Sequence, residues 1–119
     1  MAIHIKHQER AIATERTHDI HARFAHVELL LRNLTRRSTS YTEYDLVDNI
    51  KHSMMVIAMK DKVCETNEIF IDNTITEFYH AMNELININI SVEWDLFYIK
   101  LFVEDFYINP IHEDSSDSE

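Results

Sequence analysis

The chain has 119 residues, of which 45% are hydrophobic, with no glycine, one proline, one cysteine and a formal net charge of −10. The lack of glycine excludes phosphate-binding loops, dinucleotide-binding fingerprints and nucleophile elbows, which are all built on glycine turns. The lone Cys64 excludes a disulfide framework and a cysteine-rich metal site. This length supports one hydrophobic core, so we expect a single helical domain at residues 1–112 and a disordered acidic tail at residues 113–119.

Three amphipathic helices are predicted at about residues 8–36, 41–60 and 67–87, because apolar residues recur there in alternating steps of three and four. Residues 1–8 lack this period and are expected to form an arm. Ser40 and Glu43 have the spacing of a capping box at the start of the second helix, and Thr66 is expected to cap the third. The first apolar stripe consists of Ile20, Phe24, Val27, Leu31 and Leu34.

Residues 86–107 follow two incompatible patterns. Apolar and polar residues alternate over residues 86–98, as in a strand, whereas Leu96, Ile99, Val103 and Phe106 recur at helical spacing. A strand here would have to pair with a second copy of the chain, because the sequence offers no other strand. We therefore predict a fourth helix at about residues 92–108, with Ser91 as its N-cap. The predicted fold is a compact all-α bundle of four main helices.

The fourth predicted helix carries more apolar surface than a four-helix bundle buries. Trp94, Phe97, Tyr98 and Leu101 centre on the side opposite the stripe of Leu96. The sequence leaves open which side faces the core, and burial of both sides is the alternative to an interface. Aromatic residues are enriched at interface hot spots. The predicted interface, with a second copy or with a partner protein, consists of Trp94, Phe97, Tyr98, Leu101, Phe102 and Asp105.

Two Glu-x-x-His spacings, at Glu15 and His18 and at Glu77 and His80, resemble the ligand sets of di-iron helical bundles. Ligands of a metal in a bundle core must point inward. At about 100° per residue, these four side chains lie roughly 120° to 180° from the centres of their apolar stripes. We therefore predict no metal site, and no motif in the sequence indicates a cofactor.

Arg16 and His21 are separated by four residues, a spacing that resembles the catalytic motif of the HEPN ribonucleases, which are small dimeric helical bundles. The resemblance implies a cation that binds phosphate and an imidazole that transfers a proton to or from a 2′-hydroxyl. An HEPN-like ribonuclease is therefore the second alternative function. The main prediction is that the protein is not an enzyme.

Charge is distributed unevenly along the chain. Residues 1–37 hold seven Lys/Arg and four Asp/Glu, whereas residues 38–119 hold four and seventeen. The acids within the basic segment argue against direct binding of nucleic acid. The acidic body either neutralises that segment and maintains solubility or faces a basic partner. The first alternative function is a nucleic-acid mimic that blocks a DNA-binding enzyme, with carboxylates from Glu43, Asp45, Asp48, Asp61, Glu65, Glu68, Asp72, Glu77 and Glu84.

The pattern as a whole predicts a small acidic helical protein that acts by binding. We expect a homodimer that serves as an adaptor or inhibitor of a partner protein, of the type that viruses and mobile elements encode. No apolar run approaches the roughly 18 residues of a membrane-spanning helix, and the first residues lack the apolar segment of a signal peptide. The expected location is intracellular and cytoplasmic, or nuclear in a eukaryotic host.

Overall fold

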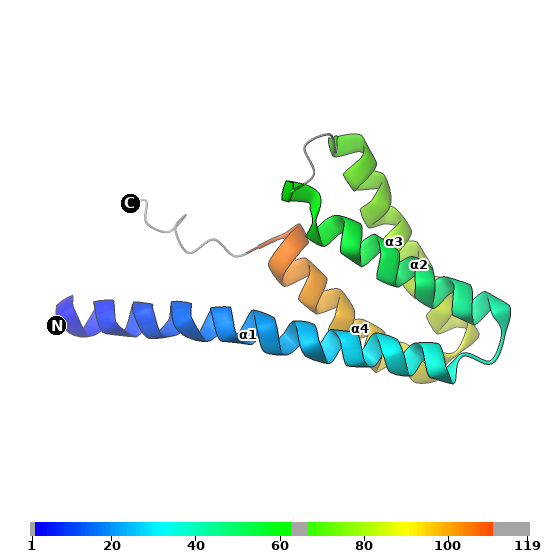
Figure 1. Ribbon diagram of the computed structural model, residues 1–119, viewed down its shortest axis with the longest axis horizontal. Helices are drawn as coiled ribbons and strands as arrows, with labels where there is room; N and C mark the ends of the chain where they lie inside the picture. The colour runs from blue at the N-terminus through cyan, green and yellow to red at the C-terminus, as the bar shows by residue number, and fades with distance from the viewer. Residues whose placement is uncertain (1, 63–66, 111–119) are drawn as a thin grey trace.

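The computed structural model describes residues 2–62 and 67–110, with side chains described from Ile20 onward (Figure 1). These residues form four main helices and no strand, so the predicted all-α fold is confirmed and the strand alternative for residues 86–98 is wrong. The predicted tail at residues 113–119 lies outside the described residues. The elements are α1 (Ala2–Arg37), α2 (Tyr41–Ala58), the 3-10 turn η1 (Lys60–Lys62), α3 (Glu68–Ile88), the 3-10 turn η2 (Ile90–Val92), α4 (Glu93–Val103) and the π-helical turn η3 (Glu104–Ile108).

Helix α2 ends at Ala58 and α4 at Val103, slightly before the predicted ends near residues 60 and 108, and larger differences occur in α1 and α3. Helix α1 begins at Ala2, so the predicted arm at residues 1–8 is wrong. No proline or glycine interrupts the backbone there, and a helix can continue without an apolar stripe where its residues have adequate helix propensity. Helix α3 continues to Ile88, so the connection expected between the predicted helices at about residues 67–87 and 92–108 is reduced to Asn89 and the short η2.

The start of α2 confirms Ser40 as its N-cap, because the Ser40 hydroxyl oxygen accepts a hydrogen bond from the Glu43 N–H at 3.1 Å. The second half of the capping box differs. The Glu43 carboxylate accepts from the N–H and the hydroxyl of Thr39, at 2.9 and 2.8 Å, instead of from Ser40. The backbone donor of Thr39, and then its hydroxyl, hold the pKa of Glu43 below its ordinary value. Glu43 is buried under these contacts.

Asparagine side chains begin the two later helical segments. Asn67 caps α3, with its side-chain oxygen accepting from the Phe70 N–H at 2.7 Å. The predicted cap, Thr66, was one residue too early and lies outside the described residues. Ser91 is likewise not the N-cap of α4. Its N–H and hydroxyl donate to the side-chain oxygen of Asn89, at 3.1 and 2.6 Å, and this contact starts η2, which leads directly into α4.

The helices are arranged as two antiparallel pairs (Figure 1). Helices α2 and α3 form a closely packed hairpin, and α4 returns along the C-terminal half of α1. The N-terminal half of α1 extends beyond the other helices, as the weak apolar character of that half indicates. The backbones of α3 and α4 approach each other less closely than those of either pair.

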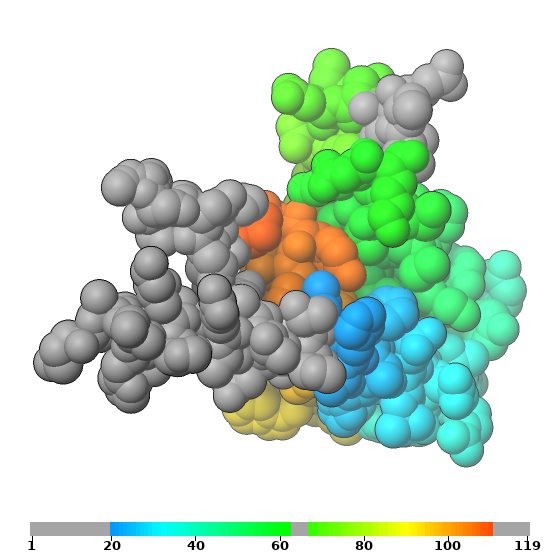
Figure 2. Space-filling model, turned by 60° about the vertical axis from the view of Figure 1, so that its left-hand side comes forward, coloured from blue at the N-terminus to red at the C-terminus, as the bar shows by residue number. Residues whose placement is uncertain are grey.

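One cluster of buried apolar side chains draws on all four helices, including Val27 of α1, Ile50 of α2, Phe78 of α3 and Phe102 of α4. Burial of each such side chain contributes about 1.5 to 3 kcal/mol before entropy costs. Figure 2 shows the C-terminal part of α4, in orange, between α1 in blue and α2 in green. The inner side of α4 consists of Leu96, Ile99, Phe102 and Val103, all of which are buried.

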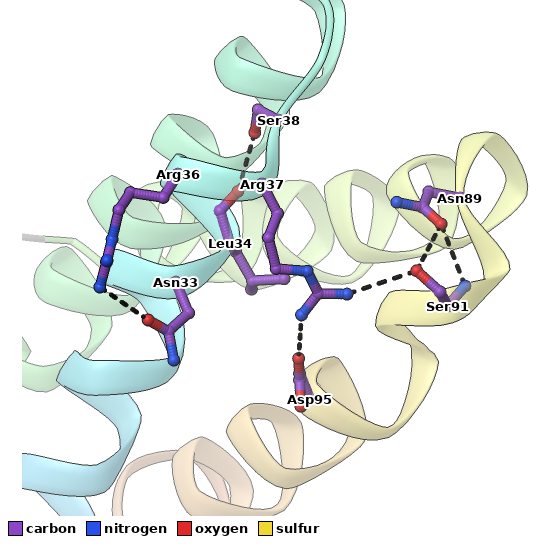
Figure 3. Close-up of polar contacts among 8 residues, drawn as sticks. All are labelled: Asn33, Leu34, Arg36, Arg37, Ser38, Asn89, Ser91 and Asp95. Carbon is purple, nitrogen blue, oxygen red and sulfur yellow. Dashed lines mark hydrogen bonds and ion pairs between the residues drawn. The ribbon is translucent and has the colours of Figure 1, made fainter.

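Polar contacts fix the rotation of α4 about its axis. The Arg37 guanidinium at the end of α1 lies 3.0 Å from the Asp95 carboxylate and donates to the Ser91 hydroxyl at 3.3 Å (Figure 3). At the other end of α4, the Arg23 guanidinium lies 3.6 Å from the Asp105 carboxylate. Both arginines come from α1, so Asp95 of α4 and Asp105 of η3 are each held toward α1.

Candidate protein-interaction surface

The outer side of α4 is apolar and exposed. Trp94 is 80% exposed, Phe97 40% and Leu101 39%. At about 100° per residue, these three side chains lie within a sector of about 60°. Ile90, in the turn just before α4, is 68% exposed and extends the same spacing by four residues. We call Ile90, Trp94, Phe97 and Leu101 the outer stripe.

The two aromatic rings of the outer stripe are stacked. The ring centroids of Trp94 and Phe97 are 6.1 Å apart, with an angle of 18° between the ring planes. Stacked aromatic pairs attract each other beyond the area they bury. Ile90 was missed because it lies between the third and fourth predicted helices. Its position, four residues before Trp94, was the signal that could have found it.

A groove of about 530 Å³ lies beside the outer stripe, between α3 and α4. It lies where the backbones of α3 and α4 are farther apart, because α3 packs most closely on α2 and α4 packs on α1. The periodicity of the sequence could not reveal this groove, because it depends on how the two pairs are placed. The groove is lined by Tyr79, Met82, Asn83 and Ile86 from α3 and by Glu93, Trp94, Phe97 and Lys100 from α4.

A hydrogen bond ties α3 to the turn that follows α4. The Tyr79 hydroxyl donates to the Glu104 carboxylate at 2.7 Å. Desolvation of the phenol, with this hydrogen bond and the nearby negative charge, raises the pKa of Tyr79 to about 12. Glu104 begins the π-helical turn η3, in which the Asn109 N–H donates to the Glu104 carbonyl at 2.7 Å. Turns of this kind often mark functional sites.

Two opposite charges flank the outer stripe along its groove edge. Glu93 is exposed, and Lys100 is half-buried with its ammonium nitrogen 6.0 Å from the centroid of the Phe97 ring. Neither side chain has an ion-pair partner among the described residues. The other edge of the stripe is neutral, with Ser91 and Tyr98.

The six predicted interface residues occupy three environments. Trp94, Phe97 and Leu101 lie together in the outer stripe. Tyr98 is half-buried toward α1, where its ring meets the His26 ring edge-on at 4.7 Å between centroids. Asp105 is also half-buried and is paired with Arg23. Phe102 is fully buried in the core, so it supports the surface from beneath and offers no area to a partner.

The residues considered for a metal site, a ribonuclease site and a nucleic-acid mimic lie in several elements of the fold. No group of three His, Cys, Asp or Glu that could hold a metal occurs among the described side chains, and His80 contacts Glu84 rather than Glu77. Glu15, Arg16 and His18 lie in the part of α1 whose side chains are not described, and His21 is exposed. Of the carboxylates proposed for a nucleic-acid mimic, Glu43 is buried and Glu65 lies outside the described residues.

None of the described helices combines the length and the apolar character that crossing a membrane requires. No protein-family model matches the sequence, and no curated protein and no solved structure matches it significantly.

Proposed function

We propose that the protein is a protein–protein interaction module, an adaptor or inhibitor that acts by binding through the outer stripe and the adjacent groove. The observation that carries this proposal is the exposure of Trp94, stacked on Phe97 and continuous with Leu101. Tryptophan is among the residue types that dominate the energy of protein interfaces. The partner is a second copy of the chain, as in the predicted homodimer, or another protein.

The stripe offers a substantial exposed area to a partner. At 80% exposure, Trp94 offers roughly 200 Å² of surface. Covering that surface would contribute about 5 kcal/mol at 25 cal/mol per Å², before the loss of translational and rotational freedom is subtracted. Ile90, Phe97 and Leu101 add further apolar area along the same line.

The shape favours a protein over a small molecule as the partner. The groove alone has a volume in the range of ligand pockets. The outer stripe, however, begins at Ile90, before α4, and reaches Leu101, and neither of these residues lines the groove. An elongated apolar stripe with a groove along one edge is the surface that an amphipathic helix covers.

Photo-crosslinking from the stripe tests the proposal. A photoreactive amino acid replaces Leu101 in the full chain, expressed in cells, and a matched variant carries it at Tyr41, an exposed aromatic position on α2. We expect a defined protein adduct from position 101 that disappears when Trp94→Glu is added, and no such adduct from position 41. The proposal is overturned if position 101 gives no protein adduct, or if both positions give the same adducts.

A further inference from the structure

The outer stripe has the spacing of a coiled-coil seam. Its members, at positions 90, 94, 97 and 101, follow steps of four, three and four, which alternate the a and d positions of a heptad. The inner side of α4 is already buried against the core. The stripe is therefore a second apolar seam, on α4 and the preceding turn η2, that none of the described helices of the same chain covers.

The charges beside this seam indicate what that helix is. Glu93 directly precedes Trp94, and Lys100 directly precedes Leu101, so both occupy the same edge position in successive heptads. Charges at such positions set partner choice and orientation in coiled coils. When two copies of the helix run antiparallel, this edge of one copy faces the same edge of the other. Glu93 then faces the partner's Lys100, and Lys100 faces the partner's Glu93.

We propose that a second copy of this chain covers the outer stripe, with the two α4 helices antiparallel. A two-fold axis passing between Asp95 and Leu96 brings Trp94 onto the partner's Phe97 and Ile90 onto the partner's Leu101. The same register produces both Glu93–Lys100 pairs. The apolar contacts and the charged contacts therefore favour the same alignment of the two α4 helices. Such an interface is isologous, meaning that both copies use the same surface. Two-fold symmetric dimers of this kind are the commonest soluble oligomers.

A parallel arrangement fits the charges less well. It would bring Glu93 opposite the partner's Tyr98, which leaves this carboxylate without a cation. It would also bring Lys100 toward the partner's Asp105, which is already paired with Arg23 of its own chain. In the antiparallel arrangement, the neutral edge of the outer stripe brings Ser91 toward the partner's Tyr98. Neither residue carries a charge at neutral pH.

This inference rests on the proposed function, because it names the occupant of the same surface. The seam is only about three helical turns long, so we expect dissociation constants on the order of micromolar. Sedimentation velocity of the full chain over a range of concentrations therefore measures the dimer directly. Trp94 is the only tryptophan in the chain, so a blue shift of its emission as the dimer forms reports burial of this surface.

Charge reversal separates the antiparallel register from other dimers. Glu93→Lys opposes two lysines across the seam and Lys100→Glu opposes two glutamates, so each should weaken the dimer at least tenfold. The double variant Glu93→Lys/Lys100→Glu restores the opposite charges and should recover dimerisation. An equimolar mixture of the two single variants should form a heterodimer. A matched pair of reversals at exposed sites on α2, Asp48→Lys and Lys51→Glu, should leave the dimer unchanged.

The outcomes distinguish this inference from the function on which it rests. Recovery in the double variant, together with heterodimer formation, supports the antiparallel pairing. A wild-type chain that stays monomeric to about 100 µM, some hundredfold above a micromolar dissociation constant, overturns it. A dimer that the double variant fails to restore overturns it equally. A defined adduct from position 101 to a different protein, with no self-association, removes this inference and leaves the proposed function standing.

Discussion

The two sides of α4 are similarly apolar in sequence and opposite in environment. Leu96, Ile99 and Phe102 are fully buried, whereas Trp94 on the other side is 80% exposed. The difference shows that hydrophobicity alone does not decide which side of a helix enters the core. Contacts from distant segments decide it, because the Phe102 ring lies 6.1 Å from that of Phe24 and Arg37 holds Asp95 toward α1.

Truncation of one aromatic residue on each side gives the largest expected contrast. Phe102→Ala leaves a cavity in the core and should lower the free energy of unfolding by about 3 to 5 kcal/mol. Trp94→Ala should change it by less than about 0.5 kcal/mol, provided that the protein is dilute enough to be monomeric. Urea denaturation followed by circular dichroism measures both. Similar losses in the two variants would show that the outer side also stabilises the monomer.

The helices could be predicted from the sequence because burial of a periodic stripe is a local property. Val27, Leu31 and Leu34 are buried as their spacing predicts, and Ser40 caps α2 as its spacing to Glu43 predicts. The rotation of α4 could not be predicted, since both of its sides satisfy the helical period. It depends on partners from distant parts of the sequence, such as Arg37, which lies 58 residues from Asp95.

The candidate site was predictable in part for the same reason. Trp94, Phe97 and Leu101 could be placed together because they share one sector of one helix, and their role in an interface stays a prediction. Phe102 was misplaced because it lies beside the same sector in sequence, yet the packing of Phe24 draws it inward. The groove was missed because it lies between α3 and α4, whose separation is set by their packing on α2 and α1.

Arg23 of α1 contacts residues at the boundary between the buried and the exposed side of α4. Its guanidinium carbon lies 5.2 to 5.7 Å from the ring centroids of Tyr98, Phe102 and Phe106, and it also pairs with Asp105. Arg23→Gln should lower the free energy of unfolding by about 1 to 2 kcal/mol, through loss of cation–π and ionic attraction.

The charge and the planar shape of Arg23 can be separated. Arg23→Lys keeps the charge but cannot stack on the rings as a guanidinium does, so we expect it to recover only part of the loss in urea denaturation. Arg32→Gln, at an exposed position of the same helix, serves as the control and should change stability by less than about 0.5 kcal/mol. Equal losses from Arg23→Gln and Arg32→Gln would contradict a specific role for the ring contacts.

The smallest expected effect on stability concerns Tyr79. This residue lines the groove beside the outer stripe and is not one of the fully buried residues of the core cluster. Tyr79→Phe removes the hydrogen bond to Glu104 and should cost about 1 kcal/mol at neutral pH. Because the bond joins α3 to η3, hydrogen exchange should accelerate at residues 104–108 while amides around Ile99 keep their protection. An equal acceleration of hydrogen exchange at all amides of α4 would mean that loss of this hydrogen bond also destabilises the buried side of the helix.

The pH dependence of the stability of Tyr79→Phe tests whether the fold favours the protonated phenol of Tyr79. The folded-state pKa of Tyr79 is about 12, above the value of about 10 for an unfolded chain. Folding therefore favours the protonated phenol, and this contribution is fully present below about pH 10 and is lost as pH rises toward 12. The stability difference between wild type and Tyr79→Phe, measured by urea denaturation, should accordingly narrow between pH 10 and pH 12. A constant difference across that range would mean that burial and the contact with Glu104 do not raise the pKa of Tyr79 in the folded state.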